Sequence, residues 1–274
     1  MLKPSTSAFH QLEQTGWESA AAAYDDAFAR LTTQSVSPLL DTLELASGTR
    51  LLDLCCGPGY VAGEAAHRGA KATGLNFSAA MVERARKNHP NAQFKQGDAE
   101  VLPFADASFD AVSMNYGLLH LDRPEQALAE ISRVLVPGGR FAFTVWAPPA
   151  KTLGFQLVLG AVEACGKMDV ALPPGPPFFQ YSDPKNTTAA LEAVGLAQVK
   201  IVEVKQVWRF QDAEEIFTAM MSGTVRTAAL LRAQSATDLE RIRVRIIEKA
   251  HDFRTSSGIE IPMPSVLSSA RKPA

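Results

Sequence analysis

A glycine-containing loop between a predicted strand and a predicted helix constrains the fold of this chain more than any other feature. The apolar run at residues 50–55 leads into Cys56-Gly57-Pro58-Gly59, and a helical pattern follows that ends near residue 69. Glycines let the backbone turn tightly and approach a ligand closely, and the start of the helix presents unpaired N–H groups to that ligand. Dinucleotide-binding enzymes share such a loop, so it predicts an α/β fold without identifying the ligand.

Strands and helices alternate downstream of this loop as far as residue 147. Short runs of strand-forming residues predict four further strands, at 71–75, 93–96, 109–115 and 141–146. Helical patterns at 78–88 and 122–135 lie between them. Alternation of this kind predicts a parallel sheet covered by helices on both faces.

The segments on either side of this core are less regular. We predict helices at 10–31, 37–45, 152–165 and 184–194, two or three helices within 212–253, and long strands at 198–210 and 259–270. We therefore expect a single domain over residues 1–274, consisting of an N-terminal helical segment (1–47), a cofactor-binding core (48–147) and C-terminal strands with a helical lid (148–274). The lid is expected mainly at 148–182 and 212–253.

Composition excludes several classes of protein. Apolar residues make up 46% and charged residues 20% of the 274, which is typical of a globular protein. The longest uncharged stretch, residues 170–182, contains four prolines and is too short to span a membrane. With no predicted secretory signal and only three cysteines, we expect a cytoplasmic protein. A net charge of −2 argues against nucleic acid or a membrane as partner, and leaves a small-molecule substrate. The oligomeric state stays open, with a homodimer as one option.

Polar and aromatic residues follow the second and third predicted strands at informative positions. Asn76 comes 19 residues after Gly57, where a ribose-binding side chain is expected. Phe77 and Met81 offer apolar surface to the face of an adenine ring. Asp98, after the third strand, can accept a hydrogen bond from an exocyclic adenine amine.

These segments resemble the class I S-adenosylmethionine-dependent methyltransferases, in the small-molecule branch that includes the ubiquinone and menaquinone biosynthesis enzymes. The matching sequence segments lie within about residues 48–147, and they are LLDLCCGPG, GLNFSAAM, GDAEVLPF, SFDAV and EISRVLVPGGR. The resemblance implies an α/β, Rossmann-like, seven-stranded mixed sheet with an antiparallel last strand and a helical lid insertion. It also implies S-adenosylmethionine as cofactor and S-adenosylhomocysteine as product.

The same resemblance implies roles for individual residues. The expected cofactor-binding residues are Tyr24, Asp53, Cys56, Gly57, Gly59, Asn76, Phe77, Met81, Asp98, Ala99, Glu100 and Asn115. Asp53 and the glycine loop would hold the methionine portion, and Tyr24 would close over it. The family usually has an acidic residue where this chain has Asn76, so we expect cofactor binding to survive but to weaken.

Two residues after the fourth predicted strand are candidates for catalysis. His120 lies at the carboxyl edge of the sheet and could act as a base near neutral pH. The alternative is a structural histidine bonded to the backbone. Tyr116 either orients an acceptor or only shapes its loop. The other histidines are scattered and no pair has metal-ligand spacing, so we expect no metal.

Aromatic and methionine side chains gather after residue 147. They predict either an apolar lid over the sheet edge or an ordinary helix core, and they are Phe155, Phe178, Phe179, Tyr181, Trp208, Phe217, Met220 and Met221. The resulting hypothesis is methyl transfer to a hydroxyl, amine or carbon of a small, largely apolar metabolite, such as a secondary metabolite. The alternatives are a non-methylating reaction such as a cyclisation on the same fold, a cofactor-binding regulatory subunit and, more remotely, a nicotinamide-dependent enzyme.

Overall fold

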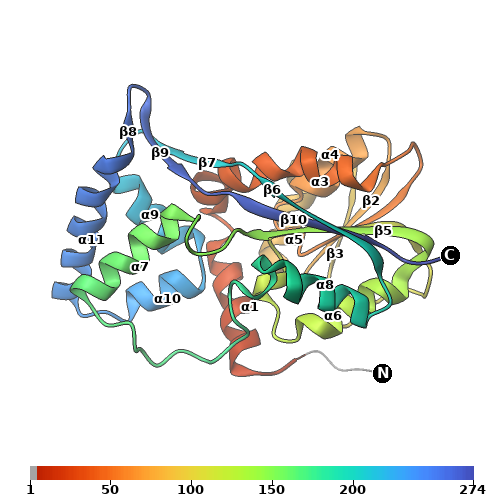
Figure 1. Cartoon of the computed structure of the whole chain (residues 1–274), viewed down its shortest axis with the longest axis horizontal. Helices are drawn as coiled ribbons and strands as arrows, with labels where there is room; N and C mark the ends of the chain where they lie inside the picture. Colours follow the sequence, from red (N-terminus) through yellow and green to blue (C-terminus); the bar gives the residue numbers. More distant parts are fainter. Residues whose placement is uncertain (1–4) are drawn as a thin grey trace.

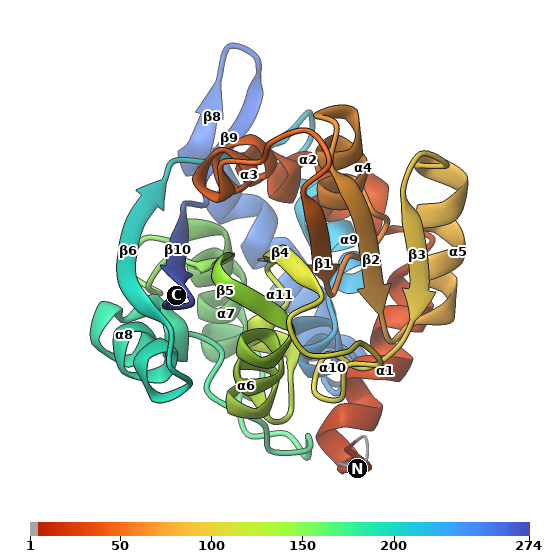
Figure 2. The same cartoon turned by 90° about the vertical axis from the view of Figure 1, so that its right-hand side faces the viewer.

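A seven-stranded mixed sheet forms the centre of the molecule. The computed structural model describes residues 5–274. The strand order is β3-β2-β1-β4-β5-β10-β6 (Figure 2). The strands are β1 (Arg50–Leu54), β2 (Lys71–Asn76), β3 (Gln93–Gln96), β4 (Phe109–Asn115), β5 (Leu135–Trp146), β6 (Ala197–Val204) and β10 (Ser265–Arg271). The first five pair in parallel, and β10 runs antiparallel to both β5 and β6. The expected mixed sheet with an antiparallel last strand is confirmed.

Helices cover both faces of this sheet (Figure 1). One face carries α3 (Val36–Leu43) and α4 (Tyr60–His67), and the other carries α6 (Pro124–Val134) and α8 (Pro184–Ala193). The helix α5 (Ala79–Asn88) shares a buried apolar cluster with α3 and α4. Short helical turns occur at η3 (Leu118–His120), η4 (Gln180–Ser182) and η5 (His251–Phe253). Apolar positions at helical spacing therefore bury against both sides of one sheet.

The N-terminal segment departs from the single helix predicted at 10–31. The structure has α1 (Ala8–Ala20), a turn, and then the short pieces η1 (Asp25–Ala29), α2 (Arg30–Thr32) and η2 (Thr33–Ser35). The prediction of one continuous helix was wrong because the apolar spacing continues across the turn, whereas the backbone changes there from α-helix to the π-helical turn η1.

The two long strands predicted at 198–210 and 259–270 are each broken. Beyond β6 and before β10, the chain forms a separate antiparallel sheet, β7-β9-β8, from β7 (Val207–Phe210), β9 (Gly258–Pro262) and β8 (Arg254–Thr255). The breaks coincide at Gln206 and Met263, where the Met263 N–H donates to the Gln206 carbonyl at 2.9 Å. Pro264 has no N–H group, so it cannot continue the backbone hydrogen bonds of a strand pair. The side chain of Gln206 is buried, and it donates to the Leu31 carbonyl.

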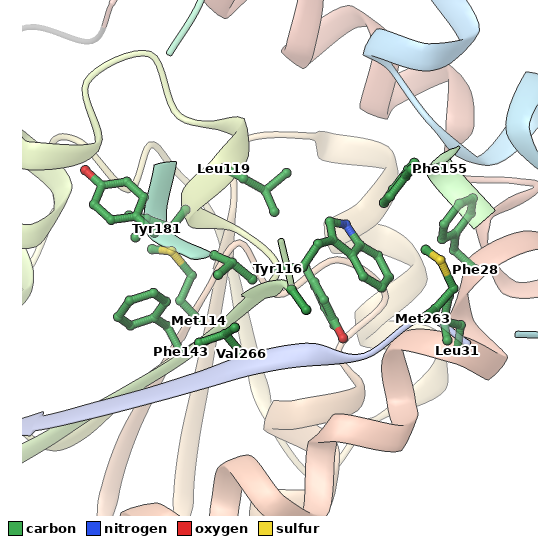
Figure 3. Packing of buried hydrophobic residues seen from close by; sticks show 14 of the residues in the cluster. Phe28, Leu31, Met114, Tyr116, Leu119, Phe143, Phe155, Tyr181, Met263 and Val266 are labelled. Atoms are coloured by element: carbon green, nitrogen blue, oxygen red, sulfur yellow. The ribbon is translucent and has the colours of Figure 1, made fainter. Parts of the chain in front are cut away.

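Four helices gather at one end of the molecule, beside α1 (Figure 1). They are α7 (Leu153–Cys165), α9 (Glu214–Gly223), α10 (Arg226–Arg232) and α11 (Ala236–Ala250). The predicted breaks near residues 222 and 235 are confirmed. Figure 3 shows buried side chains on both sides of the junction with the sheet, among them Phe143 and Val266 from the sheet and Phe28 and Phe155 from the helical segments. This continuous core favours the single-domain assignment, which stays a prediction. Within residues 5–274, no helix combines the length and apolar character needed to cross a membrane.

A buried tryptophan and the Gln34 side chain, which bonds the backbone of Val207, fasten the small sheet to the N-terminal segment. Trp208 is 2% exposed, packs against Phe28 and Phe210, and donates from Nε1 to the Ala27 carbonyl at 3.1 Å. Its replacement by phenylalanine would leave that carbonyl without its partner.

We expect Trp208→Phe to lower the free energy of unfolding by about 1–3 kcal/mol, measured by urea denaturation. Val202→Ala is the control, because Val202 is 54% exposed and should change stability by less than about 0.5 kcal/mol. Equal stability of wild type and Trp208→Phe would contradict the fastening role.

Candidate functional site

A cavity lies at the carboxyl ends of the parallel strands, around the point where the strand order reverses between β1 and β4. This edge is where open α/β sheets bind ligands. Ten of the predicted site residues line it: Tyr24, Gly57, Asn76, Phe77, Met81, Asp98, Ala99, Asn115, Tyr116 and His120. Segments from α1, α7, α10 and the loop around Phe178 close the cavity on the side away from the sheet.

One end of the cavity combines apolar surface with a buried acceptor. Phe77, Met81 and Ala99 form its wall. The Asp98 Oδ1 atom accepts from the Glu100 N–H at 2.9 Å, whereas Oδ2 is buried and has no partner in the described part of the chain. Buried carboxylate oxygens are nearly always paired, so this atom indicates a donor supplied by a ligand.

Asn76 lies beside this end, at the tip of β2. Its side chain is buried, and its Oδ1 atom accepts from the Ser78 N–H at 2.9 Å. Ser78 in turn caps α5 by accepting from the Met81 N–H. The side-chain oxygen of Asn76 therefore fixes the start of α5 as well as facing the ligand edge.

The glycine loop is held in place from below by Asp53. This fully buried carboxylate accepts from the Ala62 N–H at 3.2 Å and from the Ser113 hydroxyl at 2.8 Å. Burial raises the pKa of Asp53 to about 7, although both hydrogen bonds act in the opposite direction. Asp53 and Cys56 line a small recess that adjoins the main cavity through Gly57.

The two glycines of the loop have different surroundings. Gly57 has a φ of +49°, and no atom lies within 4 Å of where a Cβ would stand. Gly59 has a φ of +89°, and a Cβ there would lie 2.8 Å from the Phe94 ring. Gly57 thus faces open space at the cavity, whereas Gly59 packs into the protein interior.

Two of the predicted cofactor-binding residues, Gly59 and Glu100, line neither the main cavity nor its recess. All the other predicted site residues line one or the other. The Glu100 carboxylate is fully buried and accepts from the backbone N–H groups of Asp122 and Arg123, and from the Arg123 guanidinium. It fixes the loop before α6. A direct contact of either residue with a ligand stays a prediction.

The polar groups of three cavity-wall residues already have hydrogen-bond partners within the protein, and these residues are Asn115, Tyr24 and Tyr116. Asn115 accepts from Ser35 and Thr144 and donates to the Thr32 carbonyl. The Tyr24 hydroxyl lies 3.0 Å from that of Thr32, and burial raises the pKa of Tyr24 to about 12.

Tyr116 has a φ of +56°, and its ring packs against Trp146 in a tilted arrangement with 4.2 Å between the ring centres. Its hydroxyl donates to the buried Gln206 side chain, and burial raises its pKa. Tyr116 therefore supplies a wall, with its hydroxyl already committed.

The other end of the cavity is aromatic. Its walls include Trp17, Phe28, Trp146, Phe155 and Phe178. Phe155 and Phe178 were among the candidates for an apolar lid. The concentration of aromatic residues after residue 147 gave no indication of Trp17 and Phe28, because both come from the N-terminal segment.

His120 lies at this aromatic end and is paired with a carboxylate that sequence reasoning missed. Its Nδ1 atom lies 3.0 Å from Glu13 Oε2, and Arg226 Nε lies 2.9 Å from Glu13 Oε1. Burial acts to raise the pKa of Glu13, but His120 and Arg226 outweigh it and lower the pKa. The available signal was Glu13 itself, four residues after Phe9 and four before Trp17, on the inner face of α1.

Comparison with known proteins agrees with this geometry. Residues 52–143 match the family model of a methyltransferase domain. The demethylmenaquinone methyltransferase of Beutenbergia cavernae is 39% identical over 123 residues, 43% of this chain and 51% of that protein. The 2-phytyl-1,4-naphtoquinone methyltransferase of Thermosynechococcus vestitus is 40% identical over 116 residues, 40% of this chain and 52% of that protein. The chain thus spans about half the length of the curated relatives it matches.

A solved structure extends the likeness over nearly the whole fold. The [4+2]-cyclase SpnF superposes with a TM-score of 0.60 at 20% sequence identity, covering 99% of this chain and 98% of that one. At this identity the likeness concerns the fold alone. The strand order, the domain match and the quinone-enzyme relatives agree with one another: over residues 52–143 the chain is similar to the methyltransferase domain, and its core resembles the methyltransferases of quinone biosynthesis.

Proposed function

We propose that this protein transfers a methyl group from S-adenosylmethionine to a hydroxyl, amine or carbon of a small, largely apolar metabolite. One observation carries the proposal: a single cavity is lined by eight of the twelve predicted cofactor residues and, at its other end, by an aromatic wall with His120. The quinone methyltransferases among its relatives also fit an apolar acceptor. A cytoplasmic location, and the exclusion of nucleic acid and membranes as partners, stay predictions.

The residues present fit S-adenosylmethionine. The unpaired Asp98 Oδ2 atom can accept from an adenine amine, and Phe77 and Met81 can cover the faces of the ring. The open space at Gly57 allows the backbone to approach a ligand closely. Asp53, beneath the same loop, places a carboxyl group on the side of the cavity where the cationic methionine portion is expected, and a cation there would favour its ionised form.

The chemistry requires alignment more than acid or base strength. Bound S-adenosylmethionine supplies a methyl group on a positively charged sulfur, which is a good leaving group. The aromatic walls around Trp146 and Phe155 would exclude water and hold the acceptor against the methyl group. Tyr116 would contribute its ring to this wall, since its hydroxyl is bonded to Gln206.

The deciding experiment has two stages. Calorimetry with S-adenosylhomocysteine tests cofactor binding, and a screen of phenolic, amine and polyketide-like acceptors tests release of S-adenosylhomocysteine from S-adenosylmethionine. Binding with release supports the proposal. Conversion of an acceptor without release would favour a non-methylating reaction, the alternative for which the SpnF fold gives a precedent. Absence of binding would contradict the proposal.

The loop glycines provide a matched pair of variants. We expect Gly57→Ala to lower the affinity for S-adenosylhomocysteine at least about tenfold, equivalent to about 1.4 kcal/mol, because the new methyl group enters the ligand space. Its unfolding free energy should fall by only about 1–2 kcal/mol, the cost of a left-handed alanine.

Gly59→Ala should instead lower the free energy of unfolding by about 2–5 kcal/mol. An alanine there would have a strained left-handed backbone, and its Cβ would also clash with the Phe94 ring. Calorimetry and urea unfolding measure the two effects. Equal loss of affinity in both variants, after correction for the folded fraction, would contradict the assignment of Gly57 to the ligand side.

Asn76 provides a second test of the cofactor end. We expect Asn76→Asp to leave the affinity for S-adenosylhomocysteine unchanged or to improve it. The carboxylate keeps an acceptor for the Ser78 N–H and gains a second oxygen for the ribose hydroxyls. Asn76→Ala, which removes both functions, should weaken binding by about 1 kcal/mol or more. A large loss of affinity for Asn76→Asp in a calorimetric titration would contradict the ribose assignment.

A further inference from the structure

The Glu13 carboxylate is fully buried, and three side chains that line the cavity share it. His120 Nδ1 lies 3.0 Å from Oε2, and Trp17 Nε1 donates to the same oxygen at 3.1 Å. Arg226 Nε donates to Oε1 at 2.9 Å. Each of these three partners belongs to the cavity lining.

The other fully buried carboxylates serve the backbone of the fold. Asp53 accepts from an N–H of α4, and Glu100 accepts from two N–H groups before α6. Glu13 accepts only from side chains in the hydrogen bonds described. Glu13 therefore holds side chains of the cavity wall in place, whereas Asp53 and Glu100 hold a helix start and a loop.

The geometry fixes the orientation of the imidazole. A carboxylate accepts hydrogen bonds, so His120 Nδ1 donates to Glu13, and Nε2 is the ring nitrogen that this hydrogen bond leaves unused. The Trp17 ring packs edge-to-face at 4.9 Å and the Phe178 ring at 6.2 Å, which restricts rotation of the imidazole. Asp122, the other carboxylate close to His120 in sequence, is bonded to Ser5 instead.

Arg226 connects this pair to the surrounding segments. Its guanidinium donates to the carbonyls of Leu119 and Pro176 as well as to Glu13, and it lies 4.4 Å from the centre of the Phe9 ring. A buried carboxylate needs a compensating cation. Arg226 supplies this charge to Glu13 on the Oε1 side, opposite the oxygen that His120 contacts.

We propose that Glu13 and Arg226 are positioning residues that make His120 a general base, and that the acceptor is therefore a phenol or an enol. The acceptor O–H gives its proton to His120 Nε2. The electron pair released on oxygen forms the new bond to the methyl carbon, while the carbon–sulfur bond breaks and its pair returns to sulfur. Glu13 stabilises the imidazolium that results. This inference rests on the proposed methyl transfer and narrows its acceptor.

The first test reads the imidazole directly and requires no turnover. Nitrogen-15 NMR of the full chain at mildly alkaline pH, with and without S-adenosylhomocysteine, reports which nitrogen of each histidine carries the proton, and His120→Gln assigns the His120 signals. We expect His120 to be protonated on Nδ1 in wild type and to lose this preference in Glu13→Gln. Glu18→Gln is the control, because Glu18 lies on the same helix and bonds only Ser78 and the Ala80 N–H. A proton on Nε2 in wild type would overturn the proposal.

The second test separates a base from a structural histidine. With 2-naphthol as acceptor, Glu13→Gln and His120→Gln should lower kcat about 10²-fold or more, while S-adenosylhomocysteine affinity stays within about twofold of wild type. With 4-nitrophenol, which is largely ionised under the same conditions, the loss should be much smaller. Equal losses on both phenols would overturn the proposal, as would methylation of amines alone.

The two proposals can fail separately. Absence of S-adenosylhomocysteine binding would remove the proposed function, whereas the NMR result on His120 would stand by itself. Binding without methylation of either phenol would overturn the acceptor assignment only. Because Glu13 is buried, circular dichroism of Glu13→Gln checks its fold, and the wild-type NMR spectrum supplies the test if that variant is unfolded.

Discussion

The hydrogen bonds of Asp53 are the interaction on which the rest of the site depends. This single carboxylate joins three elements: it lies on β1, accepts from Ser113 on β4 and accepts from Ala62 in the first turn of α4. The glycine loop spans the gap between β1 and α4, so its shape is set by where these elements are held. Burying a carboxylate is costly, and the raised pKa of Asp53 reflects that cost. Cationic charge in the adjoining recess would reduce it.

The core between residues 50 and 146 could be predicted from the sequence because its signals are local. Each strand and helix between residues 50 and 146 has its own apolar period and its own turn, and Asn76, Phe77 and Asp98 sit where strands end. The breaks at Gln206 and Met263 could not be predicted in this way. The apolar pattern runs through them, and the cause is a backbone hydrogen bond between residues far apart in sequence.

The aromatic end of the cavity could be predicted only in part, at His120, Phe155 and Phe178, because it is assembled from distant segments. Glu13, His120 and Arg226 come from an N-terminal helix, a turn after β4 and a helix of the C-terminal block. Their association depends on tertiary packing alone, so no spacing rule brings them together. Glu13 could have been noticed as a charge on the inner face of α1, but its partners could not.

The crossing at Gln206 and Met263 has a consequence for how such a protein can change over time. The segment between them leaves and rejoins the main sheet at one point, closed by a backbone hydrogen bond that any residue except proline can donate at position 263. Helices can be lengthened, shortened or exchanged within that segment without altering the register of β6 against β10. Variation within this segment can therefore reshape the cavity wall at residues 223–227, whereas the aromatic wall at Trp146, Phe155 and Phe178 lies outside the segment.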